Sequence, residues 1–243
     1  MLKVSNLKKN YHDSKNEVYA IEDVSFTLNE EEFISIVGPS GCGKSTILSI
    51  LANVETKSGG IIDNDKTIGY MLQSDLLFDW LTIVDNCLIG LKMQNKINKY
   101  SKKYVNSLLE KYGLYDFKDM YPSSLSGGMR QRVALIRTLA LNPDVLLLDE
   151  PFSALDYQTR IAVSDDVYRI LKEENKSAIM VTHDISEAVS MADKVLILSN
   201  IPSHVIKEIK INYSNRKNPL ENRKSSEFNL YCEEILKEIN KNV

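Results

Sequence analysis

Apolar residues recur along the chain with two periods, one typical of strands and the other of helices. Residues 2–8 and 18–28 alternate apolar with polar side chains and are rich in β-branched and aromatic residues. This pattern predicts two strands, separated by the polar stretch 10–17. Residues 33–37 are a short apolar run, typical of a strand buried on both faces, and residues 47–51 then have the apolar spacing of a helix. We therefore expect a strand, a loop and a helix in direct succession.

The rest of the chain first becomes helical and then alternates again. Residues 74–143 have a helical period throughout, which predicts a helical subdomain inserted into the fold. After it, apolar runs of strand length alternate with amphipathic helices, and this alternation favours an α/β fold with a largely parallel sheet. A polar tail, 212–243, contains a late helix at 228–239. The alternating segments are strands at 145–148, 178–181 and 194–198 and helices at 158–173 and 185–191.

Composition narrows the class of protein. The chain has 243 residues, 43% of them hydrophobic, and a net charge of −3, which suits one α/β domain and gives no strongly basic surface for nucleic acid. Its three cysteines, Cys42, Cys87 and Cys232, lie far apart, so a disulfide framework or a zinc site is not expected. The start has no apolar signal region, and no run of about 18 apolar residues could cross a bilayer. These features favour a cytoplasmic protein without a membrane span of its own.

A glycine-rich loop joins the strand at 33–37 to the helix that follows. The pattern Gly38-x-x-x-x-Gly43-Lys44-Ser45 is that of a phosphate-binding loop, in which backbone N–H groups and a helix N-terminus face phosphate oxygens. Lys44 can reach the β- and γ-phosphates, and the Ser45 hydroxyl can ligate Mg²⁺. We therefore expect the whole loop to bind ATP: Gly38, Pro39, Ser40, Gly41, Cys42, Gly43, Lys44, Ser45 and Thr46.

Two carboxylates follow the apolar strand at 145–148. Ligands bind at the carboxyl ends of the strands in such sheets, so Asp149 and Glu150 are expected beside the phosphate loop. Asp149 is the candidate that holds Mg²⁺, and Glu150 is the candidate that polarises the attacking water. Together with the loop, this pair predicts a P-loop NTPase.

A third motif narrows the class further. Residues 125–132, Leu-Ser-Gly-Gly-Met-Arg-Gln-Arg, resemble the signature sequence of ABC transporter ATPases, with Met129 where many members have glutamine. Ser126, Gly127 and Gly128 open a helix and so form a second candidate anion site. In the family this site faces the ATP of a second copy. The resemblance therefore implies a homodimer in which two chains enclose two nucleotides.

The remaining family motifs follow in the expected order. Gln73 resembles the Q-loop glutamine near the metal and the attacking water, and Asp156, in 153–156, resembles the D-loop aspartate at the dimer interface. His183 resembles the switch histidine that contacts the γ-phosphate. Tyr11 is the candidate aromatic residue that stacks on adenine, with Tyr19 as the alternative.

The resemblance covers roughly residues 1–210 and implies the organisation of the whole system. An ABC ATPase domain is expected at 1–211, with a P-loop core, an antiparallel β layer shortened at 53–72 and the helical insert at 74–143. The cofactors would be ATP and Mg²⁺. The partners would be a transmembrane permease, a second copy and an extracellular substrate-binding protein, with no nucleic acid. The protein would lie peripherally on the cytoplasmic face of the membrane.

The transported substrate is less sharply indicated. Residues 76–83, Leu-Leu-Phe-Asp-Trp-Leu-Thr-Ile, together with 126–135, resemble the nitrate, sulfonate and taurine importer branch, while related branches import thiamine precursors or riboflavin-like compounds. Two rival classes are a soluble ABC ATPase acting on nucleic acid or ribosomes and a P-loop kinase or GTPase. Soluble ABC ATPases of this kind usually have long coiled coils or two cassettes in one chain, and neither is present here. Residues 125–128 and His183 argue against a kinase or GTPase.

Two local expectations concern single side chains. Cys42 lies beside Lys44 and a helix N-terminus, which predicts a depressed thiol pKa and fast alkylation. Trp80, the only tryptophan, either is buried in the core, as large side chains usually are, or lines an exposed groove that receives a helix of the permease.

Overall fold

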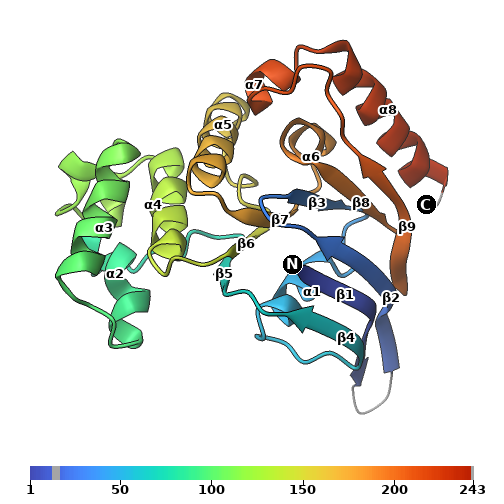
Figure 1. The fold of residues 1–243 in the computed structure, drawn as a ribbon, viewed down its shortest axis with the longest axis horizontal. Helices are drawn as coiled ribbons and strands as arrows, with labels where there is room; N and C mark the ends of the chain where they lie inside the picture. Colours follow the sequence, from blue (N-terminus) through green and yellow to red (C-terminus); the bar gives the residue numbers. More distant parts are fainter. Residues whose placement is uncertain (13–16, 242–243) are drawn as a thin grey trace.

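The computed structural model describes residues 1–12 and 17–241. Within them the strands form one mixed sheet of nine strands, in the order β4-β1-β2-β9-β8-β3-β7-β6-β5, with helices on both sides (Figure 1). The strands are β1 (Leu2–His12), β2 (Glu17–Leu28), β3 (Phe33–Val37), β4 (Gly59–Asn64), β5 (Ile68–Met71), β6 (Val145–Asp149), β7 (Ser177–Val181), β8 (Lys194–Leu198) and β9 (Ser203–Lys210).

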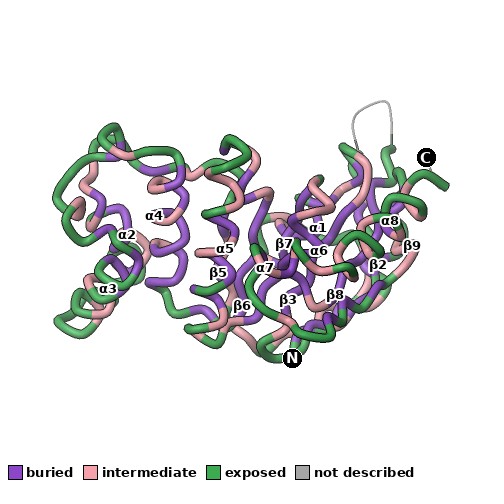
Figure 2. The backbone as a smooth tube through the Cα atoms, turned by 90° about the horizontal axis from the view of Figure 1, so that it is seen from above, coloured by how far each residue is buried: buried purple, intermediate pink, exposed green. Residues whose placement is uncertain are grey.

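Five neighbouring strands, β8, β3, β7, β6 and β5, run parallel and confirm the α/β fold predicted from the sequence. Their side chains alternate between two cores. In β6, Val145 and Leu147 pack in the core shared with α1 (Lys44–Leu51), whereas Leu146 and Leu148 pack in the core on the opposite face. This division follows from the two-residue period of a strand and explains why the runs are apolar throughout. Figure 2 shows β3, β6, β7 and β8 as buried.

The first strands form the antiparallel part of the sheet. β1 pairs antiparallel with both β2 and β4, and β2 joins the rest of the sheet through β9. Leu2, Val4 and Ile21 from this part share their core with α1, so α1 lies between the antiparallel strands and the parallel ones. Gly60 has a φ of 85°, and a Cβ there would lie 2.3 Å from the carbonyl oxygen of Asn6. Only glycine permits this close approach of β4 to β1.

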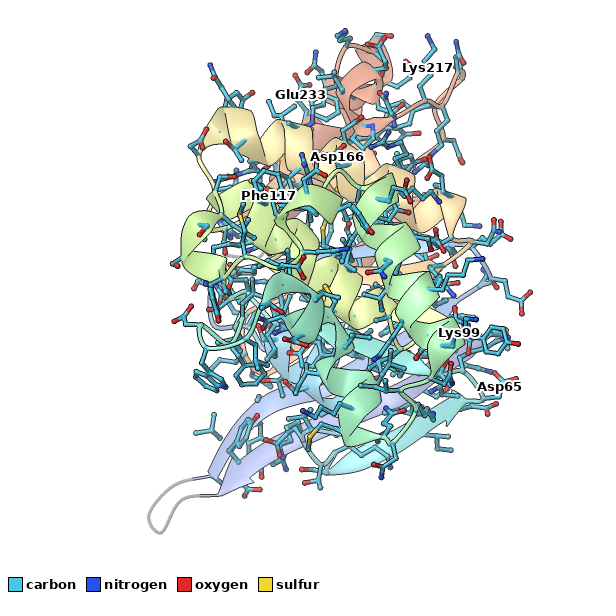
Figure 3. All side chains as sticks on the ribbon, turned by 90° about the vertical axis from the view of Figure 1, so that its left-hand side faces the viewer. Asp65, Lys99, Phe117, Asp166, Lys217 and Glu233 are labelled. Carbon is cyan, nitrogen blue, oxygen red and sulfur yellow. The ribbon has the colours of Figure 1, made fainter. Side chains whose placement is uncertain are left out.

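The region predicted to be a helical insert contributes three α-helices and two short 3-10 turns. The helices lie together to one side of the sheet, on the left of Figure 1. An ion pair between Arg132 Nη2 and Asp166 Oδ2, at 2.6 Å, joins this group to the core helix α5 (Tyr157–Glu173); Asp166 is labelled in Figure 3. The helices are α2 (Ile83–Met93), α3 (Lys99–Lys111) and α4 (Gly127–Leu139), and the 3-10 turns are Tyr115–Phe117 and Pro122–Ser124. The subdomain limits at 74, 143 and 211 stay predictions.

The remaining helices are α5 (Tyr157–Glu173), α6 (Ile185–Met191), α7 (Pro219–Asn222) and α8 (Ser226–Lys241). The polar tail is packed against the core, because Ile235 of α8 is fully buried and the rings of Tyr213 and Tyr231 meet edge to face at 6.1 Å. Arg216 also binds the carbonyl oxygens of Met191 and Ala192 at the end of α6. Across residues 1–12 and 17–241, each helix is too short or too polar to span a bilayer.

Candidate functional site

The glycine-rich loop connects β3 to α1 as the sequence predicted. Gly41 and Gly43 have φ angles of 77° and 94°, in the left-handed region that favours glycine, and Gly43 is the N-cap of α1. Lys44 is 6% exposed, and its ammonium group donates hydrogen bonds to the carbonyl oxygens of Gly38 and Pro39, at 2.9 and 2.8 Å. The loop therefore curls around the lysine, which places a cation and a helix N-terminus in one anion-binding cradle.

Asp149 ends β6 beside this loop. Its Oδ1 accepts a hydrogen bond from Ser45 Oγ at 2.9 Å, and its Oδ2 accepts one from Tyr70 OH at 3.1 Å. The side chain is 5% exposed, and this burial raises its pKa, whereas the two hydrogen bonds act to lower it. A carboxylate and a hydroxyl are hard oxygen ligands of the kind that Mg²⁺ prefers.

The donor set around Asp149 fits Mg²⁺ bound together with phosphate. Among the described residues, no group of three or more His, Cys, Asp or Glu side chains is arranged to hold a metal ion by itself. Mg²⁺ is usually held by one or two carboxylates together with substrate phosphates and water, rather than by an all-protein cage. Ser45 and Asp149 supply such a partial set next to the phosphate loop.

Glu150 is the centre of a second cluster. Its Oε2 accepts a hydrogen bond from Gln73 Nε2 at 3.1 Å and lies 3.3 Å from His183 Nδ1. The three residues come from segments that follow β5, β6 and β7, which are neighbours in the sheet. Glu150 has a φ of 43°, an unusual angle for a residue other than glycine, and such strain is typical of functional sites.

The loop and the glutamate cluster line one open cleft with a volume of about 670 Å³. The cleft brings together residues that are more than 140 positions apart in the sequence. Its lining consists of groups that can bind phosphate, ligate a metal or orient water: Ser40, Gly41, Gly43, Lys44, Ser45, Thr46, Gln73, Glu150 and His183. The arrangement is suited to phosphoryl transfer from a nucleotide to water.

Ser126, Gly127 and Gly128 lie outside the lining of this cleft. Ser126 caps α4, accepting a hydrogen bond from the Met129 N–H at 3.4 Å. A Cβ on Gly128 would lie 3.1 Å from side-chain carbons of both Thr159 and Val163, so the glycine allows α4 to pack closely on α5. The two phosphate-binding candidates are therefore separate sites within one chain.

Asp156 has an evident structural role. It is the N-cap of α5, and its Oδ1 accepts hydrogen bonds from the N–H groups of Gln158 and Thr159, both at 3.1 Å. Hydrogen bonds from Thr159 also lower the pKa of this carboxyl group. The predicted contact of Asp156 with nucleotide stays a prediction.

Neither candidate for adenine stacking lines the cleft. The Tyr11 ring is partly exposed and lies under the Lys9 ammonium group, 4.7 Å from the ring centroid. Tyr19 is also exposed, and its hydroxyl binds Glu17 Oε2 at 3.0 Å. Stacking of Tyr11 on adenine, with Tyr19 as the alternative, stays a prediction.

The expectation for the Cys42 thiol was wrong. Its side chain is 1% exposed in the core shared with α1, and this burial raises the thiol pKa, although Lys44 acts in the opposite direction. Desolvation opposes formation of the thiolate more strongly than the nearby cation favours it. The Cys42 thiol packs in the core, so only the backbone of Cys42 is available to the phosphate loop.

The segment after Gln73 presents aromatic rings to solvent. Trp80 is 73% exposed and Phe78 is 37% exposed, and their ring centroids lie 5.1 Å apart. Leu77, which directly precedes Phe78, is buried. Asn86 of α2 fixes this turn, because its amide donates to the carbonyl oxygen of Phe78 and its Oδ1 accepts from the Phe78 N–H. Trp80 is therefore a surface residue, not part of the core.

Two contacts that organise the site could not be predicted from the sequence. Tyr70 looks like an ordinary strand residue, yet its hydroxyl reaches Asp149. Asp75 makes a two-point ion pair with Arg130 of α4, at 2.8 and 2.9 Å, and Arg137 donates to the backbone carbonyls of Asp75 and Leu76. Both contacts join segments that no local pattern connects, although the position of Tyr70 three residues before Gln73 could have drawn attention to it.

Fold and site together define a P-loop nucleotide-binding protein. The model of the ABC transporter family matches residues 21–153. The chain is 46% identical over 212 residues to an uncharacterized ABC transporter ATP-binding protein, YtlC of Bacillus subtilis, a match that covers 84% of this chain and 82% of the relative. The chain belongs to the ABC transporter family of ATP-binding proteins, for which ATP hydrolysis is the characteristic activity.

Relatives with named substrates and a solved structure extend the comparison. The nitrate import ATP-binding protein NrtD of Synechocystis sp. is 35% identical, covering 96% of this chain and 93% of the relative. The aliphatic sulfonates import ATP-binding protein SsuB of Bacillus cereus is 37% identical, covering 88% of each. The dimeric post-hydrolysis structure of the ATP-binding cassette MJ0796, bound to ADP and Pi, superposes with a TM-score of 0.75 at 30% identity, covering 88% of this chain and all of that one.

Proposed function

We propose that this chain hydrolyses ATP to energise a separate membrane permease that imports a small anion or organic solute such as nitrate, a sulfonate or taurine. The observation that carries the proposal is the cleft in which Lys44, Glu150 and His183 meet. The nitrate and sulfonate import relatives support the choice of substrate class. On this proposal the protein works peripherally at the cytoplasmic face of the membrane, with an extracellular binding protein delivering the solute.

Each cleft residue has a role that its chemistry supports. Lys44 and the loop N–H groups neutralise the β- and γ-phosphates, which stabilises the charge that develops in the transition state. Ser45, Asp149 and Gln73 would hold Mg²⁺, which would neutralise phosphate charge. Glu150 orients a water molecule toward the γ-phosphate, and His183 contacts the same phosphate.

A second copy would complete each nucleotide site. Ser126, Gly127 and Gly128 stand at the N-terminus of α4, away from the cleft of their own chain, and such a helix end attracts anions. In a homodimer this end of α4 would face the ATP in the partner's cleft, with Asp156 at the interface. The dimeric solved relative supports this arrangement.

The exposed aromatic turn is the proposed docking surface for the permease. Phe78 and Trp80 offer large apolar anchors, which helix-in-groove contacts use at their centre. The turn begins five residues after Gln73, so a change at the γ-phosphate reaches it over a short segment of chain. Binding of nucleotide and binding of the permease would thereby be coupled.

Uptake measurements test the proposal as a whole. Cells lacking this gene should lose uptake of radiolabelled nitrate, taurine or an alkanesulfonate, and the wild-type gene should restore it. The Glu150→Gln variant should be made at normal level without restoring it. Unchanged uptake of all three solutes would overturn the substrate class. Failure to recover a membrane permease with the detergent-extracted protein would overturn the transport role.

A further inference from the structure

The two oxygens of the Asp149 carboxylate have different partners. Oδ1 accepts from Ser45 at 2.9 Å, and Oδ2 accepts from Tyr70 at 3.1 Å. Ser45 belongs to the phosphate loop, and its hydroxyl oxygen would be shared with the metal. Tyr70 belongs to β5, outside the loop, and its hydroxyl has no part in the proposed chemistry.

The position of Tyr70 is fixed from two sides. Its backbone is paired with Leu147 of β6 in the parallel ladder, so the ring lies beside the strand that ends in Asp149. Its hydroxyl also lies 3.4 Å from Ser49 Oγ of α1, which allows a chain in which Ser49 donates to Tyr70 and Tyr70 donates to Asp149. The ring packs against the core shared with α1.

We propose that Tyr70 is a positioning residue, which fixes the Asp149 carboxylate in the orientation that receives Mg²⁺. The inference rests on the proposed function, because it takes Asp149 as a ligand of the metal that accompanies ATP. The Tyr70 hydroxyl holds Oδ2 and thereby stops the carboxylate from rotating about its terminal torsion, a torsion that is otherwise broad. Partners of this kind, outside the direct ligands, set the orientation of ligating carboxylates.

The burial of Asp149 makes this contact significant. At 5% exposure, water cannot freely replace a lost donor at Oδ2, so the carboxylate would turn toward other donors. Ser45 alone fixes one oxygen and leaves the plane of the carboxylate undefined. With Tyr70 present, the two donors define that plane before any metal arrives.

Removal of one oxygen atom tests the inference. Tyr70→Phe keeps the ring and deletes the hydroxyl, and Tyr104→Phe is the matched control, because the Tyr104 hydroxyl binds Glu174 away from the cleft. Calorimetry measures the affinity for a non-hydrolysable ATP analogue with Mg²⁺ and with EDTA. We expect Tyr70→Phe to weaken binding about tenfold in Mg²⁺, as loss of such partners typically does, and to leave binding in EDTA within twofold of wild type. Tyr104→Phe should match wild type in both.

Two other results would overturn the inference. Wild-type affinities for Tyr70→Phe under both conditions, or an equal loss with and without Mg²⁺, would show that the hydroxyl does not act through the metal. Tyr70→Met tests the same hydroxyl with a side chain of different shape and should show the same Mg²⁺-specific loss. Asp149→Asn separates this inference from the proposed function. If Mg²⁺ strengthens analogue binding in Asp149→Asn as much as in wild type, Asp149 does not hold the metal and the assignment fails. If Asp149→Asn loses this Mg²⁺-dependent gain in affinity while both Tyr70 variants keep it, only the role of Tyr70 fails.

Discussion

Gln73 meets Glu150 across the cleft because of the pairing between β5 and β6. Met71 is paired with Leu148, so the residues two positions further on, which have left the ladder, face each other with 3.1 Å between Gln73 Nε2 and Glu150 Oε2. A glutamine and a glutamate that are 77 positions apart are thus placed by strand register. The register supplies the geometry that two isolated motifs could not specify.

Replacement of Glu150 tests whether its carboxylate orients the attacking water. Glu150→Gln keeps the size of the side chain and removes the carboxylate, so turnover should fall by about 10²-fold or more, while nucleotide affinity should stay near that of wild type. Steady-state hydrolysis and calorimetry measure the two effects. Glu234→Gln, which breaks the ion pair between Glu234 of α8 and Lys207 of β9, is the control and should hydrolyse ATP normally. Near-normal turnover of pure Glu150→Gln protein would refute the assignment.

Loss of the loop lysine should act on binding. Lys44→Ala removes a buried cation that would face the phosphates of bound ATP, and charge-assisted contacts of this kind are among the strongest in a site. We expect the affinity for MgATP to fall by at least tenfold by calorimetry. Lys207→Ala removes a lysine outside the cleft and should bind ATP like wild type. An unchanged affinity in Lys44→Ala would be incompatible with a phosphate role.

A mixing experiment tests whether two chains share each nucleotide. Lys44→Ala damages the cleft, and Ser126→Arg blocks the N-terminus of α4. Each variant alone should be nearly inactive. In a mixed dimer, one site combines both intact surfaces, so part of the hydrolysis should return. Mixed dimers that are demonstrated by mass spectrometry yet show no recovery would argue against shared sites.

Neighbouring residues allow docking to be separated from stability. Trp80 is 73% exposed, so Trp80→Ala should leave the melting temperature nearly unchanged while permease assembly and uptake fall. Leu77 is 7% exposed, and Leu77→Ala should cost about 2–5 kcal/mol of folding free energy. Circular dichroism and co-purification with the permease measure these effects. A stable Trp80→Ala protein with full uptake would end the docking proposal.

All three thiols should react slowly with alkylating agents at neutral pH. Burial raises the pKa of each, to about 12 for Cys87 and about 11 for Cys232, and the thiolate is the reactive form. Cys232 is the least buried and should be labelled first, at a rate that rises as the pH approaches 11, whereas Cys42 should be labelled only on unfolding. Mass spectrometry of partially alkylated protein gives the order. Rapid labelling of Cys42 in the folded protein would contradict its burial.

Much of the fold could be predicted because its signals are local. The apolar run 33–37 predicted a buried strand, and the glycine pattern before Lys44 predicted the loop, since both depend on residues close in sequence. The cleft candidates Gln73, Glu150 and His183 came from motif order, and the structure brings them together.

Other features depend on packing that no local pattern encodes. The Cys42 thiol is buried because its side chain points into the core shared with α1, and the sequence pattern does not show this direction. The exposure of Trp80 depends on the turn that Asn86 holds, six residues later. The Tyr70 contact exists because two strands distant in sequence share a register. The order of motifs therefore locates the chemistry, and tertiary packing decides which individual atoms take part.

Arg130 and Arg137 hold residues 75–76 and so join the segment after Gln73 to helix α4 as one rigid part. Because the side chain of Asp75 and the carbonyl oxygens of Asp75 and Leu76 are all held by α4, the stretch just after Gln73 cannot shift without taking that helix with it. In the proposed dimer, one end of this part would lie at the nucleotide of its own cleft, and the other end, at Ser126, would face the nucleotide of the partner chain. The aromatic turn of Phe78 and Trp80 would move together with this part. A single movement of the turn would therefore reflect the state of both nucleotides of a dimer.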